Sequence, residues 1–243
     1  MPQKKLILVG AGPGDPELIS LKGVKALQQA NVVMYDALVS EELLQHAPNA
    51  IKLFCGKRAG THYMKQDEIN RQIVEKANQH GVVVRLKGGD PFIFGRGQEE
   101  IEYAERHGIS TEIVPGISSA TALATLRQIP LTKRGITESV WITTGTTSCG
   151  ELSEDIELAA QSTATVVILM GIGKLAEIVS LFTKYKTEHY PIAIIQNGTL
   201  PDEKIVCGHL STIQQKVLEA NISSPAVIIV GKVVDCSQIL HIR

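Results

Sequence analysis

Residues 82–100, with the sequence VVVRLKGGDPFIFGRGQEE, form the most informative stretch of the chain. Residues 82–84 are β-branched valines, which predict a short buried strand. The GGDP segment at 88–91 cannot continue that strand, so the strand is expected to end in a loop. Its two glycines allow the backbone to approach a ligand closely, and Asp90 supplies a carboxylate. A plain turn is the alternative interpretation of GGDP, although a plain turn does not require the FIFGRG that follows.

On both sides of this stretch, short apolar runs alternate with amphipathic segments, a pattern typical of an α/β protein with a mainly parallel sheet. Strands are predicted at 6–9, 32–35, 51–55, 82–84 and before Pro115, and in a second series at 140–143, 166–170, 192–196, 205–207 and 227–230. Helices are predicted near 21–27, 41–46, 67–80, 98–107, 117–126, 175–184 and 211–220. The pattern of apolar runs changes near 113–118. This change predicts two α/β lobes, 1–114 and 115–243, each with a largely parallel or mixed sheet flanked by helices. A ligand is expected in the cleft between two such lobes.

Composition limits the classes of function. The chain has 243 residues, of which 44% are hydrophobic, so it can bury a large core. Its net charge of −1 and its lack of like-charged blocks argue against a nucleic-acid partner. Residues 56–96 nevertheless hold eight Lys or Arg against four Asp or Glu. This local positive charge favours a small, strongly acidic ligand.

The cysteines and histidines predict no metal site. The four cysteines are far apart and lack the short spacing of a zinc site or redox motif, so all four are expected to be reduced, and the seven histidines form no paired motif. The N-terminal residues lack the apolar length of a signal peptide, and no run approaches a membrane span. A cytoplasmic protein with no membrane partner is expected.

The GAGPGDP segment at 10–16 invites comparison with a dinucleotide-binding loop, because it follows a strand and Asp36 ends the next strand. The spacing argues against that function. Asp15 stands where the fingerprint needs its third glycine, and Pro13 and Pro16 lack the N–H donors that would hold a pyrophosphate. A rigid loop bordering a ligand is the interpretation that remains.

Taken together, a series of motifs resembles the tetrapyrrole methylase family, and within it the members that methylate uroporphyrinogen III. The motifs are LVGAGPGDP (8–16), VVMYDALVS (32–40), GKRAG (56–60), VVRLKGGDPFIFGRG (83–97), VPGISSA (114–120), IPLTKRG (129–135), MGI (170–172), NGT (197–199) and SPAVIIVG (224–231). They occur in order and span nearly the whole chain, which is far more specific than any single motif.

The resemblance implies the two-lobed tetrapyrrole methylase fold, a homodimer and a donor site in the cleft. It implies transfer of methyl groups from S-adenosyl-L-methionine to carbons 2 and 7 of uroporphyrinogen III, giving S-adenosyl-L-homocysteine and precorrin-2 for sirohaem or cobalamin synthesis. Asp36 and Lys57 match the family's proton acceptor and proton donor. The implied donor-binding residues are Pro13, Gly88, Gly89, Asp90, Ile93, Ser118, Ser119, Met170, Gly198 and Ala226. The Ser118–Ser119 pair departs from the Thr-Ala common in relatives, which leaves the contacts at that point open.

The chemistry is consistent with these residues. Methyl transfer to an electron-rich pyrrole carbon needs alignment and exclusion of water rather than a protein nucleophile. The methylated ring is cationic and must lose a proton, which gives Asp36 a function as base; a turn-forming role at the strand end is the alternative. The substrate's carboxylates are expected to meet Lys57 and the cations Arg58, Arg85, Lys87, Arg96, Lys133 and Arg134. For several of these cations a solvated surface position is the alternative.

Two other functions stay open from the sequence. One is a methyltransferase of the same fold that acts on a later corrin intermediate, or on protein or RNA. The other is a non-catalytic nucleotide-binding or sensor module, in which substitution of Asp36 or Lys57 would leave function unchanged.

Overall fold

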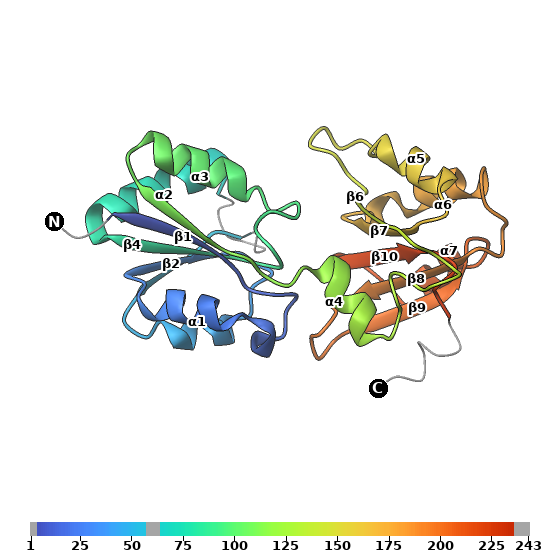
Figure 1. The fold of residues 1–243 in the computed structure, drawn as a ribbon, viewed down its shortest axis with the longest axis horizontal. Helices are drawn as coiled ribbons and strands as arrows, with labels where there is room; N and C mark the ends of the chain where they lie inside the picture. Colours follow the sequence, from blue (N-terminus) through green and yellow to red (C-terminus); the bar gives the residue numbers. More distant parts are fainter. Residues whose placement is uncertain (1–3, 57–63, 236–243) are drawn as a thin grey trace. The chain divides into compact units, whose positions relative to one another are not determined.

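A computed structural model describes residues 4–56 and 64–235 of the chain. The chain divides into two compact units, Met1–Ser118 (unit 1) and Ser119–Arg243 (unit 2). Each unit is built on its own five-stranded sheet, with helices on both faces (Figure 1). The predicted α/β class, with one parallel and one mixed sheet, is therefore confirmed.

Unit 1 is a fully parallel sheet in the order β3-β2-β4-β1-β5. Its elements are β1 (Lys5–Gly10), α1 (Leu21–Gln28), β2 (Val32–Tyr35), β3 (Ile51–Phe54), α2 (Gln66–His80), β4 (Val82–Lys87), α3 (Gly97–Arg106) and β5 (Ser110–Val114). Short 3-10 helices cover Pro16–Leu18 and Glu41–His46. Because all five strands run the same way, their carboxyl ends lie at one edge of the sheet.

Alternating side chains of the parallel strands enter two apolar cores, one on each face of the sheet. Ile7, Val33 and Val84 pack with α1 on one face. The intervening residues of the same strands, such as Leu6 and Val83, pack with α2 and α3 on the other face. Figure 1 shows α1 on one side of the sheet and α2 and α3 on the opposite side. Burial on both faces explains the continuous apolar runs in the sequence.

Unit 2 is a mixed sheet in the order β6-β7-β10-β8-β9, in which β6 and β7 are parallel and the other pairs antiparallel. Its elements are α4 (Ser119–Leu126), β6 (Val140–Thr144), α5 (Asp155–Gln161), β7 (Thr165–Leu169), α6 (Leu175–Thr183), β8 (Pro191–Gln196), β9 (Lys204–His209), α7 (Ile213–Glu219) and β10 (Ala226–Val230). A 3-10 helix covers Ile172–Lys174. Helix α5 is absent from the sequence-based prediction.

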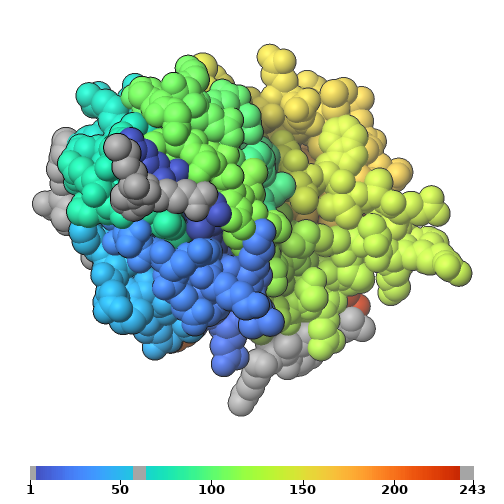
Figure 2. Space-filling view, turned by 60° about the vertical axis from the view of Figure 1, so that its left-hand side comes forward, coloured from blue at the N-terminus to red at the C-terminus, as the bar shows by residue number. Residues whose placement is uncertain are grey.

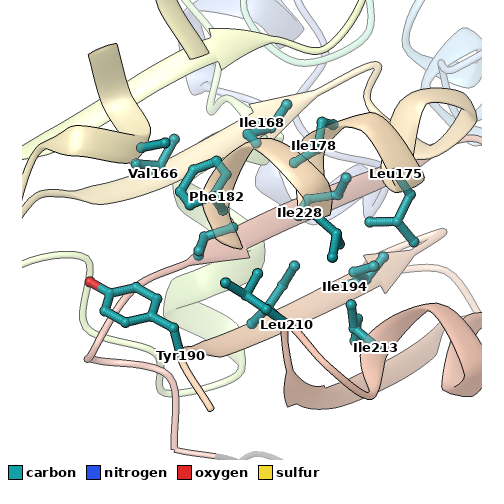
Figure 3. Packing of buried hydrophobic residues seen from close by; sticks show 14 of the residues in the cluster. Val166, Ile168, Leu175, Ile178, Phe182, Tyr190, Ile194, Leu210, Ile213 and Ile228 are labelled. Atoms are coloured by element: carbon teal, nitrogen blue, oxygen red, sulfur yellow. The ribbon is translucent and has the colours of Figure 1, made fainter. Parts of the chain in front are cut away.

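The larger core of unit 2 lies under α5, α6 and α7. Figure 3 shows Phe182 and Ile178 of α6 against Ile168 of β7 and Ile228 of β10. The opposite face of the sheet is covered by α4, whose Leu123 packs among strand residues that include Val167. These strands are fixed by packing on both faces, so the loops at their ends start from rigid positions.

One expectation about the cysteines is wrong. Cys55 and Cys149 are free thiols, but Cys207 is disulfide-bonded. Over the residues that the structure describes, no helix is long and apolar enough to cross a membrane.

Candidate active site

Four glycines join the strand ends of unit 1 by direct backbone contact. The loop after β1 pairs with the loop after β4, since Gly89 N–H donates to Gly12 O over 2.7 Å and Gly12 N–H donates to Gly89 O over 3.3 Å. A Cβ on Gly116, after β5, would lie 2.2 Å from Gly89 O, and one on Gly10 would lie 2.5 Å from Gly116 Cα. Such distances leave no room for a side chain, so the sequence needs glycine here for close packing of its own loops.

Asp90 braces the same edge with both carboxylate oxygens. Oδ1 accepts from Phe92 N–H over 2.8 Å and Oδ2 accepts from Gly116 N–H over 2.9 Å. The carboxylate therefore links the loop after β4 to the loop after β5. In the structure Asp90 stabilises these loops, and its role in binding the methyl donor stays a prediction.

Asp36 follows β2 at the same edge and belongs to a network of four charged side chains. Arg85 Nη2 donates to Asp36 Oδ1, and Lys87 Nζ lies 3.9 Å from Asp36 Oδ2. Both cations come from β4, the neighbouring strand, where residues 85 and 87 point to the same face. The second carboxylate of the network is Glu100 of α3, bonded to Lys87 over 2.9 Å and to Arg85 over 3.2 Å.

Burial differs sharply within this network. The side chains of Glu100, Arg85 and Lys87 are 0%, 2% and 5% exposed, whereas that of Asp36 is 27% exposed. Two positive and two negative groups balance in charge, which makes burial of these side chains possible. Asp36 is the member that faces solvent, as a base acting on a bound molecule must.

Burial and neighbouring charges shift three ionisation equilibria here. Burial lowers the pKa of Lys87 and nearby Arg85 lowers it further, while Glu100 and Asp36 oppose the change. Burial also works against the charged form of Arg85, yet Glu100 and Asp36 together raise the pKa of its guanidinium above the usual range. Burial raises the pKa of the Cys55 thiol, at the end of β3, to about 11. Cys55 is therefore a neutral thiol near neutral pH and no nucleophile.

The predicted substrate-binding cations occupy two different environments. Arg85 and Lys87 are buried and bonded to protein carboxylates, so their charges are already matched. Arg96 is half exposed and forms an ion pair with Glu99 over 2.7 Å, and Lys133 and Arg134 lie in an exposed loop of unit 2. Figure 2 shows the yellow-green segment that contains this loop at the surface. Lys57 and Arg58 fall outside the described residues.

The strand ends of unit 2 have unusual backbone conformations. Met170 after β7 has φ 52°, and Asn197 and Thr199 after β8 have φ 49° and 73°. Left-handed backbone is costly for residues other than glycine and is concentrated at functional sites. The register pairs Val227 with Leu169, so Ala226 at the start of β10 lies at the same edge of the sheet as Met170.

Side chains hold these loops in place. Thr146 Oγ1 donates to Met170 O over 2.9 Å, Asn197 Nδ2 donates to Asp202 Oδ2 over 2.6 Å, and Thr199 N–H donates to Glu203 Oε2 over 2.7 Å. A Cβ on Gly198 would lie 2.3 Å from the Leu123 side chain, so that loop packs directly on α4. The conformation is thus fixed before any ligand binds.

The predicted donor residues fall into two groups. Pro13, Gly88, Gly89, Asp90 and Ile93 lie in the strand-end loops of unit 1, and Ser118 is the last residue of that unit. Ser119, Met170, Gly198 and Ala226 belong to unit 2, where the last three gather at one sheet edge and Ser119 begins α4. Each group is compatible with a ligand at its own sheet edge, because backbone groups and small residues are presented there.

Two features were missed by sequence reasoning. Glu100 was not singled out, although its place among Gly97, Ile101 and Ala104 on the buried face of α3 marks it as an acid inside an apolar stripe. The threonines around Gly145 were also overlooked: Thr146 Oγ1 donates to Met170 O in the loop after β7, and Thr144 Oγ1 donates to Thr146 O. Among the residues that the structure describes, no group of three or more His, Cys, Asp or Glu is placed to hold a metal ion.

Comparison with known proteins links this geometry to one family. The family model described as Tetrapyrrole (Corrin/Porphyrin) Methylases matches residues 5–214. The chain is 45% identical over 234 residues to a uroporphyrinogen-III C-methyltransferase of Methanocaldococcus jannaschii, covering 95% of this chain and 97% of that protein. This likeness extends across both units.

Solved structures show the same fold. A uroporphyrin-III C-methyl transferase from Thermus thermophilus, complexed with S-adenyl homocysteine, superposes with a TM-score of 0.81 at 36% identity and covers 94% of this chain and 98% of its own. A cobalt precorrin-4 methyltransferase from cobalamin biosynthesis superposes with a TM-score of 0.85 at 31% identity, covering 96% of each chain.

Proposed function

The chain belongs to the tetrapyrrole methylase family, and from this premise we propose that it methylates uroporphyrinogen III at carbons 2 and 7, using S-adenosyl-L-methionine, to give precorrin-2. The observation that carries the proposal is the 45% sequence identity to a uroporphyrinogen-III C-methyltransferase over 95% of the chain. The geometry agrees with it, since a partly exposed carboxylate at the strand ends of unit 1 is available as base.

The reaction divides into a displacement and a proton loss. S-adenosyl-L-methionine supplies an activated methyl group, and the pyrrole carbon forms the new C–C bond as the C–S bond breaks. The protein has to align the two molecules and exclude water, without a protein nucleophile. The methylated ring carries a positive charge, and a proton leaves it to restore the neutral ring. We assign the acceptance of that proton to Asp36.

Asp36 is suited to this step by its neighbours. Its carboxylate is held by Arg85 on one oxygen and approached by Lys87 on the other. A base fixed in this way needs no reorganisation when the ring becomes cationic. Lys57 is assigned as the proton donor from the family resemblance alone, because it lies outside the described residues.

The donor site is proposed to use the two groups of strand-end residues named above. The family membership supports this, and so does the relative that was solved with S-adenyl homocysteine. Unit 2 would contribute the backbone of Met170 and Gly198, and unit 1 the Gly88–Gly89 turn. Preformed loops of this kind lower the entropy cost of binding.

For the substrate's carboxylates, the exposed cations are the better candidates. Arg96, Lys133 and Arg134 are accessible and can form charge-assisted hydrogen bonds. Arg85 and Lys87 are already engaged with Asp36 and Glu100, so we reassign them from substrate binding to the support of Asp36.

A homodimer is also proposed. Its support is the family resemblance together with Trp141 and Ile142, which are 36% and 38% exposed on β6, an edge strand of unit 2. Large apolar side chains on a sheet edge favour association. Sedimentation should give twice the monomer mass, and the monomer mass would contradict the proposal. The expected cytoplasmic location stays a prediction.

A second candidate function comes from the cobalt precorrin-4 methyltransferase, which superposes with a TM-score of 0.85 against 0.81 for the uroporphyrin-III C-methyl transferase. Methylation of a later corrin intermediate is therefore the alternative. Fold likeness alone does not select a substrate.

The test is to incubate the purified protein with uroporphyrinogen III and S-adenosyl-L-methionine labelled in the methyl group. Two labels per tetrapyrrole are expected, with the absorption of a dipyrrocorphin product. Oxidised uroporphyrin III, which lacks the electron-rich reduced pyrroles, is the matched control and should take up no label. If uroporphyrinogen III stays unlabelled and a later corrin is methylated instead, the alternative function is the right one.

A further inference from the structure

Glu100 of α3 is a buried acid that contacts Arg85 and Lys87 of β4. It lies on α3, where its neighbours Glu99 and Glu102 are exposed and its own side chain is 0% exposed. A carboxylate rarely occupies such a position unless it is paired.

One oxygen of Glu100 makes all of its observed contacts. Oε1 accepts from Lys87 Nζ over 2.9 Å, from Arg85 Nε over 3.2 Å and from Gln66 Nε2 over 3.1 Å. Within the described part of the chain, Oε2 has no hydrogen-bond partner. Three donors from β4 and α2 are therefore fixed on a single atom.

The same two cations reach Asp36 with their other donors. Arg85 meets Glu100 through Nε and Asp36 through Nη2, so two different donors of its rigid guanidinium are engaged. Lys87 Nζ lies between Glu100 Oε1 and Asp36 Oδ2, at 2.9 and 3.9 Å. A displacement of Glu100 would therefore release both groups that orient Asp36.

Charge balance alone does not account for this arrangement. A carboxylate anywhere near the two cations would neutralise them, but the observed oxygen also sets the direction in which each cation points. Side-chain networks in which one atom holds several donors are sensitive to small displacements.

We propose that Glu100 is a positioning residue of the methyl-transfer reaction, which holds Arg85 and Lys87 so that both face the carboxylate of Asp36. The proposal rests on the proposed function, in which Asp36 accepts the ring proton. The side chain of Glu100 is 0% exposed, so we assign its effect to Arg85 and Lys87 rather than to contact with the substrate.

The electrostatics of Lys87 give a second readout. The charged and titratable groups that face it are Arg85 on β4, Asp36 after β2, Cys55 after β3, and Glu99 and Glu100 on α3. Glu100 is one of the two influences that raise the pKa of Lys87 against burial and Arg85. Without the Glu100 charge, Lys87 loses its proton at lower pH, and the alkaline fall in kcat should begin at lower pH.

The experiment compares three variants with wild type in the labelled-methyl assay, with both substrates saturating. Glu100→Gln removes the charge at nearly constant shape, and Glu100→Asp keeps the charge but withdraws the oxygen by one methylene. Glu102→Gln, an exposed acid of the same helix bonded to Gln98, is the matched control. Donor affinity is measured by calorimetry and folding by circular dichroism.

The proposal predicts that kcat falls about tenfold or more in both Glu100 variants, with donor affinity within about twofold of wild type. It also predicts an alkaline limb at lower pH in Glu100→Gln and wild-type behaviour in Glu102→Gln. Folded Glu100→Asp with wild-type kcat would show that Glu100 only balances charge, and would overturn the proposal even if Glu100→Gln fails to fold. An inactive wild-type protein would instead contradict the proposed function.

Discussion

The two units end their strands in different ways. In unit 1 the strand ends carry a network of two buried cations, the buried carboxylate of Glu100 and the partly exposed carboxylate of Asp36. In unit 2 the corresponding loops carry left-handed backbone at Met170 and Asn197, fixed by hydroxyl and carboxylate contacts to the chain itself. The two units therefore differ in what they offer a ligand. Unit 1 offers charged side chains, and unit 2 offers backbone N–H and C=O groups in fixed loops. Transfer of a proton needs charged side chains, and recognition of the methyl donor needs well-placed polar backbone groups.

The largest expected effect concerns a feature that the strand ends of both units share, the close contact of a glycine with the backbone of a neighbouring loop. Gly116→Ala places a Cβ 2.2 Å from Gly89 O in unit 1, and Gly145→Ala places one 2.2 Å from Gly171 Cα in unit 2. Backbone atoms cannot move aside cheaply, so each variant should lose about 3 kcal/mol or more of unfolding free energy. Gly173→Ala is the control, since its Cβ would meet nothing within 4 Å. Urea denaturation measures all three, and normal stability in Gly116→Ala would show that the loops are not packed as described.

The second prediction separates the units. Arg85→Met leaves Glu100 buried without one of its two cationic partners and should cost about 3–5 kcal/mol. Arg127→Met in unit 2 breaks a more exposed pair with Glu203 and should cost about 1 kcal/mol. Chemical denaturation gives both values. Equal costs would mean that burial of the charges in unit 1 has no special energetic role.

The third prediction concerns pH. The pKa of the Cys55 thiol is about 11 in the folded state against 9.0 for an unperturbed thiol. Below about pH 9 the thiol is protonated in both states. As the pH rises from there to about 11, the unfolded state loses the proton first, so stability falls. Wild type should therefore lose about 2 kcal/mol more than Cys55→Ala between about pH 8 and pH 10.5.

The matched control for that measurement is Cys149→Ala, which removes an exposed thiol of unit 2. Its dependence of stability on pH should follow wild type. Parallel curves for wild type and Cys55→Ala would show that the environment at the end of β3 is more polar than the structure indicates.

The smallest expected effect concerns an exposed cation. Arg96→Gln should raise the KM for the tetrapyrrole several-fold and leave stability within about 0.5 kcal/mol, because its pair with Glu99 is half exposed. The difference in KM between Arg96→Gln and wild type should become smaller as salt is added, because salt screens the charge of Arg96. Arg106→Gln, at the last residue of α3, the helix that Arg96 precedes, is the control. An unchanged KM would assign Arg96 to the structure of the loop alone.

Most of the fold could be predicted from the sequence because its signals are local. The valine and isoleucine runs of β1, β4, β8 and β10 are bounded by glycine, proline or polar residues, and strands fully buried on two faces read in this way. Helix α5 (Asp155–Gln161) was missed, although α7, which also has seven residues, was predicted. Glu41–His46 forms a 3-10 helix, a distinction that side-chain periodicity does not make.

The site was predictable only in part. Motifs located the strand ends, since the functional loops of parallel sheets follow the strands. The partners of Arg85 and Lys87 could not be read from their positions, because alternate residues of a strand share a face but the sequence does not say what packs on it. Glu100, thirteen residues after Lys87, becomes a partner only when α3 folds back on β4.

The role of Asp36 as the base is tested most directly by kcat for Asp36→Asn, with uroporphyrinogen III and S-adenosyl-L-methionine both saturating. The asparagine keeps the shape of the side chain but cannot accept the ring proton. We expect kcat to fall about a hundredfold or more, donor affinity to stay unchanged, and stability to fall by about 1–2 kcal/mol because the pair with Arg85 is weakened. A folded Asp36→Asn protein with near-wild-type kcat would show that another group or solvent removes the proton.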